Sequence, residues 1–418
     1  MRQLARLAAL ALALVMLTGA TPTPTPTETP TVREREYWIA DLGIDKAWAA
    51  TKGKGVTIAV LDKGIVEGPP AFAGVVGGAD MSGVGAPNGR KPVDVKERDH
   101  GSWVASMAAA RDTGDPGEMI GVAPEASLLS VSLGFGDLAA VPFDEQVAKG
   151  IVWAVDHGAD IINLSFTTGR QSWPESWDDA FLYAMTHDVL IVVAAGNRGS
   201  GTTSVGAPAT IPGVLTVGGV DPKGKASVEA STQGITIGVA APSEELLGIG
   251  ADGTLSVWPG TSGAAPIVAG VAALVEAAHP GISAIDVMNR IIKTAKKPAD
   301  VSKVPDPLYG YGVIDAHAAV TADVPSVAKN PMGDLAAWVK VNRRQEAGPL
   351  PTQTAAPVEV PPLPPVETPP EAGSSFLPSA EELRTGTLPL FALCGAGILV
   401  VLGVIAAVRR ARSARVRR

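Results

Sequence analysis

Cysteine is almost absent from this chain. Among its 418 residues there is one, Cys394, and it lies in a long apolar run near the C-terminus. The region before that run therefore contains no disulfide. If that region is exported, its apolar core alone must stabilise it.

Charged and aromatic residues are also scarce, at 18% and 5% of the chain. Apolar residues make up 46%, which is enough for a large buried core and for membrane-directed ends. The net charge is −8, although two arginines lie in the first 20 residues and six in the last ten. Residues 21–408 therefore carry −16, and so acidic a domain is a poor partner for nucleic acid.

The first 20 residues have the pattern of a secretory signal peptide. Arg2 and Arg6 precede an apolar run from Leu7 to Leu17, and small residues follow at 18–20. The alternative is an uncleaved anchor. The apolar run is too short for it, because a membrane-spanning helix needs about 20 residues.

The C-terminal end has the pattern of a membrane anchor. Residues 388–408 contain no charge and are long enough to span a bilayer. Six arginines follow in residues 409–418, and positive charge beside a span marks its cytoplasmic side. The alternative, a nucleic-acid-binding tail, is not needed once membrane topology explains the arginines. We therefore expect the preceding domain outside the cell and the tail inside.

Proline-rich segments divide the remaining chain. Residues 21–35 begin with a Thr-Pro repeat and form a leader that builds no core. Prolines recur between Pro349 and Pro378, so we interpret residues 323–387 as a semi-rigid stalk. Residues 36–322 are left as one globular domain.

Short apolar runs alternate with helical patterns inside this domain. A mostly parallel sheet with helices on both faces, an α/β fold, is therefore expected. The predicted strands are residues 56–61, 127–132, 160–165, 189–194 and 214–217, and the predicted helices are residues 103–110, 145–157, 177–186, 263–278 and 284–295.

Three separated motifs contain an acid, a base and a nucleophile. Asp62 follows a buried strand, His100 stands in the string Asp-His-Gly-Ser, and Ser262 stands in Gly-Thr-Ser-Gly-Ala-Ala-Pro. A serine hydroxyl needs a histidine to take its proton and a carboxylate to orient that histidine. The chain order Asp, His, Ser is one known solution to this geometry. Asn197 ends the string Ala-Ala-Gly-Asn, and its amide can donate to a developing oxyanion.

Each of these residues also has an ordinary structural interpretation. Ser262 and Asp62 can be helix or strand caps, and Asn197 can be a turn residue. The other four histidines lie near helix ends or in a small-residue stretch and give no catalytic signal. The combination of the motifs in one chain favours catalysis.

With these motifs in place, the chain resembles the subtilisin-like serine proteases, the subtilases, over about residues 36–322. The resemblance implies Asp62, His100 and Ser262 as the triad and Asn197 as the oxyanion donor. It also implies that an extended peptide substrate pairs, by strand addition, with an edge of the domain. The implied substrate-binding residues are Ser165, Phe166, Thr167, Ala194, Ala195 and Gly196.

The order of segments resembles one group of subtilases, the mycosins of type VII secretion systems. Both have a signal, a short leader, a catalytic domain, a proline-rich stalk and a C-terminal span. The leader is too short for the folded prodomain of secreted subtilases. The resemblance implies protein or peptide substrates, a membrane partner and secretion-system components as further partners. Mycosins resemble domains that contain disulfides, whereas the corresponding domain of this chain has no cysteine.

The chain also departs from the subtilase pattern at several positions. Lys63 stands where Ser or Thr usually follows the triad acid, and its ammonium either alters the field at Asp62 or points to solvent. Trp103 replaces a frequent second histidine, Ser106 a usual glycine, and Gly263 a larger residue beside the nucleophile.

Two functions are compatible with these features. The first is a membrane-tethered peptidase, and the second is a weak or inactive subtilase that binds peptides or acts as a scaffold in a secretion complex. No Asp-rich loop indicates calcium, and no cofactor is predicted.

Overall fold

The computed structural model describes residues 30–93, 97–136 and 139–343. All of them belong to the first of two units of the chain, Met1–Leu363. The predicted signal peptide, membrane span and arginine tail lie outside the described residues, as do most of the leader and of the stalk.

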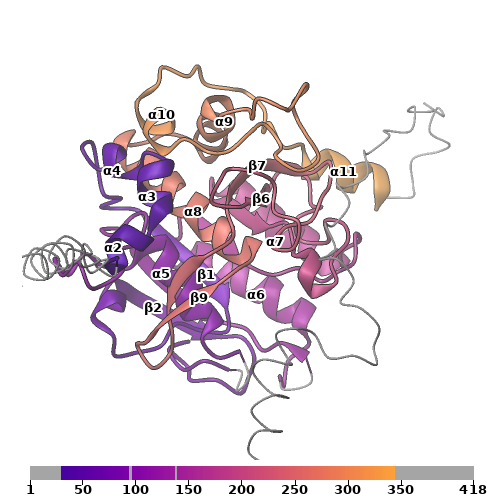
Figure 1. The fold of residues 1–418 in the computed structure, drawn as a ribbon. Coiled ribbons are helices and arrows are strands. Elements are labelled where there is room, and N and C mark those ends of the chain that lie inside the picture. Colours follow the sequence, from indigo (N-terminus) through magenta and orange to yellow (C-terminus); the bar gives the residue numbers. More distant parts are fainter. Residues whose placement is uncertain (1–29, 94–96, 137–138, 344–418) are drawn as a thin grey trace, which may run out of the picture. The chain divides into compact units, whose positions relative to one another are not determined.

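A seven-stranded sheet, in which every neighbouring pair is parallel, lies at the centre of the described residues (Figure 1). Its order is β2-β3-β1-β4-β5-β6-β7, and β8 and β9 form a separate antiparallel pair. The strands are β1 Thr57–Asp62, β2 Val75–Asp80, β3 Ser127–Ser132, β4 Ile161–Leu164, β5 Leu190–Ala194, β6 Leu215–Val220, β7 Ile237–Pro242, β8 Leu246–Ile249 and β9 Leu255–Trp258.

Helices cover both faces of the sheet, which confirms the predicted α/β class. Successive residues of a strand enter different cores, because side chains alternate across a strand. Ile58 and Val60 pack with α5, α8 and α9, whereas Ala59 and Leu61 pack with α6 and α7. The helices are α2 Val32–Arg35, α3 Tyr37–Asp41, α4 Ile44–Ala47, α5 His100–Ala109, α6 Phe143–Asp156, α7 Glu175–Thr186, α8 Thr261–Ala278, α9 Ala284–Thr294, α10 Ala316–Thr321 and α11 Leu335–Asn342, with short 3₁₀ turns at Pro70–Phe72 and Arg198–Ser200.

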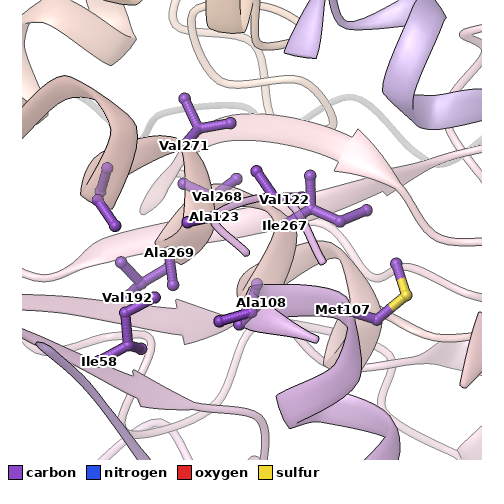
Figure 2. Close-up of a cluster of buried hydrophobic side chains, with 14 of the residues drawn as sticks. Ile58, Met107, Ala108, Val122, Ala123, Val192, Ile267, Val268, Ala269 and Val271 are labelled. Atoms are coloured by element: carbon purple, nitrogen blue, oxygen red, sulfur yellow. The ribbon is translucent and has the colours of Figure 1, made fainter. Parts of the chain in front are cut away.

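Helix α8 is the central helix of the larger core. Figure 2 shows its residue Ala269 close to Val192 of β5 and Ile58 of β1, and Ile267 and Val268 beside Val122 and Ala123. Among the described helices, α8 alone is long and apolar enough to cross a membrane, and 78% of that stretch is buried. It is therefore a core helix of the domain, and its small side chains let it lie close to the strands.

The five predicted strands are present with end shifts of at most three residues, as β1, β3, β4, β5 and β6. The prediction missed β2, β7 and the β8–β9 pair. Four helices begin two or three residues earlier than predicted: α6 at Phe143, α7 at Glu175, α5 at His100 and α8 at Thr261. These earlier starts place His100 and Ser262 inside first helical turns.

Residues on both sides of the predicted domain also pack against it. Leu335 of α11 is buried, and Arg343 pairs with Asp178 of α7 at 2.8 Å. At the other end, Thr31 caps α2, and Arg33 pairs with Asp112 at 3.0 Å. The part of the chain that contacts the sheet and its helices thus begins before residue 36 and extends past residue 322.

Glu36, between α2 and α3, is a buried carboxyl group that fastens this N-terminal segment. It is 2% exposed, and its Oε1 accepts a hydrogen bond of 3.0 Å from the Ile120 backbone N–H. Its Oε2 has no partner within the described part of the chain. Burial raises the pKa of Glu36 to about 8, so the group is protonated in the folded protein at neutral pH.

Replacing Glu36 by glutamine should remove a pH dependence of stability. Between about pH 4.5 and 8 the folded protein binds one more proton than the unfolded chain, so the wild type loses stability as pH rises. We expect Glu36→Gln to lack this loss and to exceed wild type by roughly 2–4 kcal/mol at pH 9 relative to pH 4.5. Urea denaturation at both pH values measures it. Equal pH slopes for the two proteins would contradict the buried neutral carboxyl.

Candidate active site

The three residues of the predicted triad meet at one edge of the sheet. Asp62 is the last residue of β1, a central strand, and is therefore carried to the carboxyl end of the sheet. His100 is the first residue of α5 and Ser262 the second residue of α8. Ligands of parallel sheets bind at this edge. Strand β1 and two helix N-termini thus bring together residues 200 positions apart.

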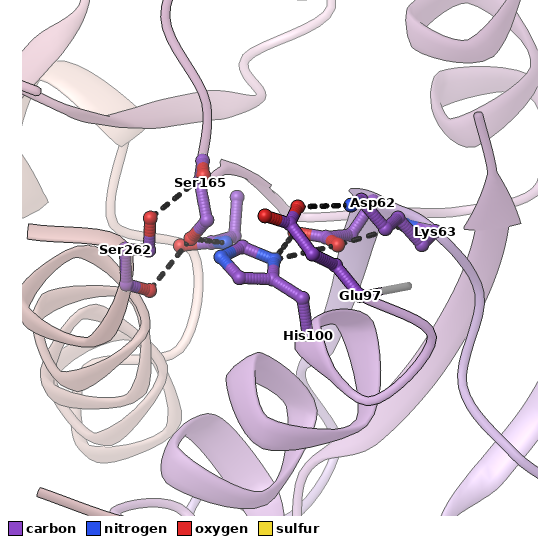
Figure 3. Close-up of polar contacts among 7 residues, drawn as sticks. Asp62, Lys63, Glu97, His100, Ser165 and Ser262 are labelled. Atoms are coloured by element: carbon purple, nitrogen blue, oxygen red, sulfur yellow. Dashed lines mark hydrogen bonds and ion pairs between the residues drawn. The ribbon is translucent and has the colours of Figure 1, made fainter. Parts of the chain in front are cut away.

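Asp62 and His100 form a close pair. The imidazole Nδ1 lies 2.8 and 2.9 Å from the two carboxylate oxygens of Asp62, which is 1% exposed. The Lys63 backbone N–H donates to Asp62 Oδ1 at 2.7 Å. Figure 3 shows the imidazole between this carboxylate and Ser262. With the carboxylate on Nδ1, the proton resides there and Nε2 is the nitrogen left to act as a base.

Ser262 is held by reciprocal hydrogen bonds with Ser165. Its Oγ donates to the Ser165 carbonyl oxygen at 3.0 Å, and the Ser165 Oγ donates to the Ser262 carbonyl oxygen at 2.9 Å. No hydrogen bond joins Ser262 to His100 in the described chain. The serine must therefore rotate about χ1 to present its proton to Nε2. Such rearrangement is common, since catalytic hydrogen bonds often form only with substrate bound.

The amide of Asn197 has a fixed orientation. Its Oδ1 accepts hydrogen bonds from the Thr261 backbone N–H at 2.8 Å and from the Thr261 hydroxyl at 2.9 Å. The oxygen is thereby committed to Thr261, so the Nδ2 donors face the other way. Gly260 has φ 138°, and a Cβ there would lie 2.9 Å from Asn197 Nδ2. A glycine is thus required for the amide to approach the start of α8.

The residues expected to pair with a substrate follow strands β4 and β5. Ser165 touches the nucleophile as described, and Phe166 is buried among Phe135 and Phe143, with ring centroids 5.7 and 5.3 Å away. The Gly196 backbone N–H donates to the Thr261 hydroxyl at 3.0 Å. A Cβ on Gly196 would lie 3.3 Å from the methyl group of Thr167, so the two segments are neighbours.

Ala194 and Ala195 differ from the other expected substrate residues in that they belong to the core of the sheet. Both side chains are buried, and the Ala195 backbone N–H donates to Val217 within the sheet at 3.0 Å. Their side chains therefore serve the core, and only the chain just beyond them reaches the edge of the site.

Lys63 does not point to solvent, which was one of the two expectations for it. Its side chain is 6% exposed, and its ammonium forms an ion pair with the carboxylate of Glu97, which is 73% exposed. The ammonium also lies 5.4 Å from the centre of the Phe135 ring. The Asp62 carboxylate accepts a hydrogen bond from the Lys63 backbone N–H, and Glu97 neutralises the charge of the Lys63 side chain (Figure 3).

Trp103 and Gly263, two departures from the subtilase pattern, are explained by one packing arrangement. Trp258 is 4% exposed, its ring lies 5.8 Å from that of His100 at 70°, and the Trp103 ring lies 5.4 Å away. A Cβ at Gly263 would lie 2.3 Å from Leu246 Cδ1 and 3.2 Å from the Trp258 ring. The indole and Leu246 thus fill the space that a side chain at 263 would need, and Leu246 would have to shift to admit one.

Ser106 also has a structural role. Its hydroxyl donates to the Trp103 carbonyl oxygen at 2.7 Å and accepts from the Ile249 backbone N–H at 3.1 Å. This ties β8 to α5. Nearby, Asp99 accepts from the Ala251 backbone N–H at 2.7 Å. The hairpin that carries Trp258 is therefore fastened to the helix that carries His100.

The sequence motifs did not single out Thr261 or Trp258. Thr261 stands inside the Ser262 motif, and that position was its only signal. Trp258 lies four residues before Ser262, but nothing in the sequence shows which way its ring turns. Within the described ranges, no group of three or more His, Cys, Asp or Glu side chains can hold a metal ion.

A family model and known proteins agree with this geometry. The model described as the subtilase family matches residues 53–312. The chain is 32% identical over 365 residues to mycosin-4 of Mycobacterium tuberculosis, covering 76% of this chain and 75% of that protein. It is 33% identical over 292 residues to subtilisin DY of Bacillus licheniformis, covering 68% and 97%.

Solved structures show the same fold. MycP1 with its N-terminal propeptide removed gives a TM-score of 0.60 at 31% identity, over 70% of this chain and 98% of that one. MycP3, a protease from the type VII (ESX-3) secretion system, gives 0.60 at 30% identity, over 71% and 90%. The chain therefore belongs to the subtilase family and is a subtilisin-like serine protease related to the mycosins.

Proposed function

We propose that this protein is a membrane-anchored, extracytoplasmic serine endopeptidase that uses Asp62, His100 and Ser262. The Asp62–His100 pair carries the proposal, because it leaves Nε2 basic at the sheet edge that holds Ser262. A helix N-terminus at Ser262 and the oriented amide of Asn197 add the donors that acyl transfer needs.

The reaction proceeds in two acyl transfers. His100 Nε2 takes the Ser262 proton as Oγ attacks the carbonyl carbon, and Asn197 Nδ2 donates to the oxyanion. His100 then gives the proton to the leaving nitrogen, the C–N bond breaks, and the acyl group remains on Ser262. Water repeats the sequence and releases the acid. Asp62 stabilises the imidazolium in both halves.

A type VII secretion system is the partner that the family relations support. The MycP1 and MycP3 structures are described as proteases of such systems. The segments at 1–20 and 388–408 support export and anchoring. The catalytic domain then faces outward, and its substrates are proteins or peptides at the cell envelope.

A phosphonate probe for serine nucleophiles tests the catalytic assignment. The wild type should be labelled, and labelling should vanish in Ser262→Ala. Peptidase activity should fall by several orders of magnitude in Ser262→Ala and in His100→Ala, because triad members act as a unit. If the wild-type protein is folded but is neither labelled nor active, the result would instead favour the alternative function, a scaffold that binds peptides.

Asn197→Ala is the graded control for this experiment. It leaves the nucleophile and base in place, so labelling should persist while kcat falls by roughly 10²–10³. Thermal unfolding of each variant checks that the fold survives. An unchanged kcat in Asn197→Ala would remove the oxyanion role from this residue.

The Lys63–Glu97 pair should affect the pH profile in two opposite directions. A positive charge near His100 disfavours the imidazolium, whereas a negative charge favours it. Lys63→Ser should therefore raise the midpoint of the acid limb of kcat/KM, and Glu97→Gln should lower it. Each shift should stay below about half a pH unit, because Glu97 is largely exposed and the pair compensates.

The double variant Lys63→Ser, Glu97→Gln serves as the control. It removes both charges, so its midpoint should return close to that of the wild type. pH–rate profiles of the four proteins make the comparison. Shifts of the same sign in both single variants would show that the pair acts on packing and not through charge.

Membrane topology is tested on intact cells. Added protease should digest the catalytic domain and spare a tag placed after Arg418, because the arginines keep that end inside. A chain that ends at Pro349 should be released as soluble protein. A digested tag with a protected domain would reverse the proposed orientation.

A further inference from the structure

A pocket of about 570 Å³ opens beside the candidate oxyanion donor. Asn197 and Gly260 form its border with the catalytic residues, and Trp258 forms part of its wall. The remaining lining includes Glu229, Glu244 and Glu245. Its size suits one extended side chain and part of its backbone.

The pocket lies on the leaving-group side of the scissile bond. The acyl part of a substrate is expected along residues 165–167 and 194–196, and none of these residues lines the pocket. Asn197 separates the two regions, because the scissile carbonyl oxygen must lie at its Nδ2. When the acyl part of a substrate lies along residues 165–167, the substrate chain continues past Asn197 in the opposite direction. The residues that follow the cleaved bond therefore enter the pocket.

Three carboxylates make the pocket strongly negative. Glu244 accepts a hydrogen bond from Ser227, whereas the exposed carboxylates of Glu229 and Glu245 make no hydrogen bond or ion pair in the described part of the chain. No lysine or arginine lines the pocket. Burial, together with Glu245 and Glu244, raises the pKa of nearby Tyr37.

Val257 and Pro259 give this pocket an apolar wall next to its charges. Val257 is 57% exposed, so its side chain is open to a ligand, whereas Trp258 between them is 4% exposed. Lysine and arginine combine a long aliphatic stem with a terminal cation. Such a side chain can pack its stem on Val257 while its charge reaches the carboxylates.

We propose that this pocket binds a lysine or arginine side chain of the leaving group, within the first few residues after the scissile bond. The proposal rests on the proposed peptidase function and names one determinant of its specificity. Glu229 and Glu245 supply the selectivity, and Val257 supplies the packing.

Cleavage profiling of a peptide library tests the proposal. The full-length protein in detergent digests the library, and mass spectrometry records the residues that follow each cleaved bond. One cleaved sequence is then made as quenched fluorescent peptides with lysine, leucine or glutamate at each of the first three leaving-group positions. At one of these positions lysine should exceed leucine in kcat/KM, and leucine should exceed glutamate.

Charge removal assigns that preference to the pocket. An exposed ion pair is worth about 2–5-fold in affinity, so Glu229→Gln with Glu245→Gln should lower the lysine-to-leucine ratio by about 4–25-fold. The ratio should also shrink as salt rises from 0.05 to about 0.5 M. Glu118→Gln is the matched control, because it removes an exposed glutamate that does not line the pocket.

A chromogenic amide of the same acyl sequence separates the possible failures. Its leaving group has no side chain, so the double variant should hydrolyse it at the wild-type rate. Wild-type protein that cleaves neither substrate would remove the peptidase function itself. Cleavage of both with no lysine preference, or a preference that survives in the double variant, would overturn the pocket assignment alone.

Discussion

The packing of α8 against the parallel sheet determines where Ser262 lies relative to Asp62. The valines of α8 and its alanines from Ala264 to Ala273 are completely buried, and they allow the helix to lie close to β1 and β5. The first turn of α8 therefore lies at the carboxyl edge of the sheet, next to Asp62 at the end of β1. An enlarged side chain inside α8 would displace Ser262 and Thr261 together, because overpacking moves whole helices.

Hydrogen bonds across segments fix the residues that this packing brings near one another. Ser165 and Ser262 hold β4 to α8, while Asn197 and Thr261 hold the end of β5 to the same turn. Asp62 and His100 join β1 to α5. Removing His100 would leave the buried Asp62 carboxylate without its imidazole partner, and an unpaired buried charge is destabilising. The residues of the proposed triad are thus also structural connections, and variants that remove them must be checked for folding.

The sequence predicted the central strands and the triad, because both leave local signals. Apolar runs of four to six residues mark buried parallel strands, and Ser262 lies in a distinctive string. Strand β2 was missed because Gly77 and Gly78 interrupt its apolar pattern, and β7 because alanine, glycine and proline dilute its own. The orientation of Asn197 and the position of Trp258 depend on contacts with residues far along the chain. No local pattern encodes such contacts, so these features emerged only from the fold.

The space beside Ser262 couples the side chains that positions 263, 246 and 258 tolerate. A larger residue at 263 would require Leu246 to move and would press on the Trp258 ring, and a smaller residue at 258 would leave a cavity next to His100. Substitutions at residues that share one filled space have non-additive effects on stability. The effect of a single substitution taken from a relative therefore depends on which residues occupy the other two positions.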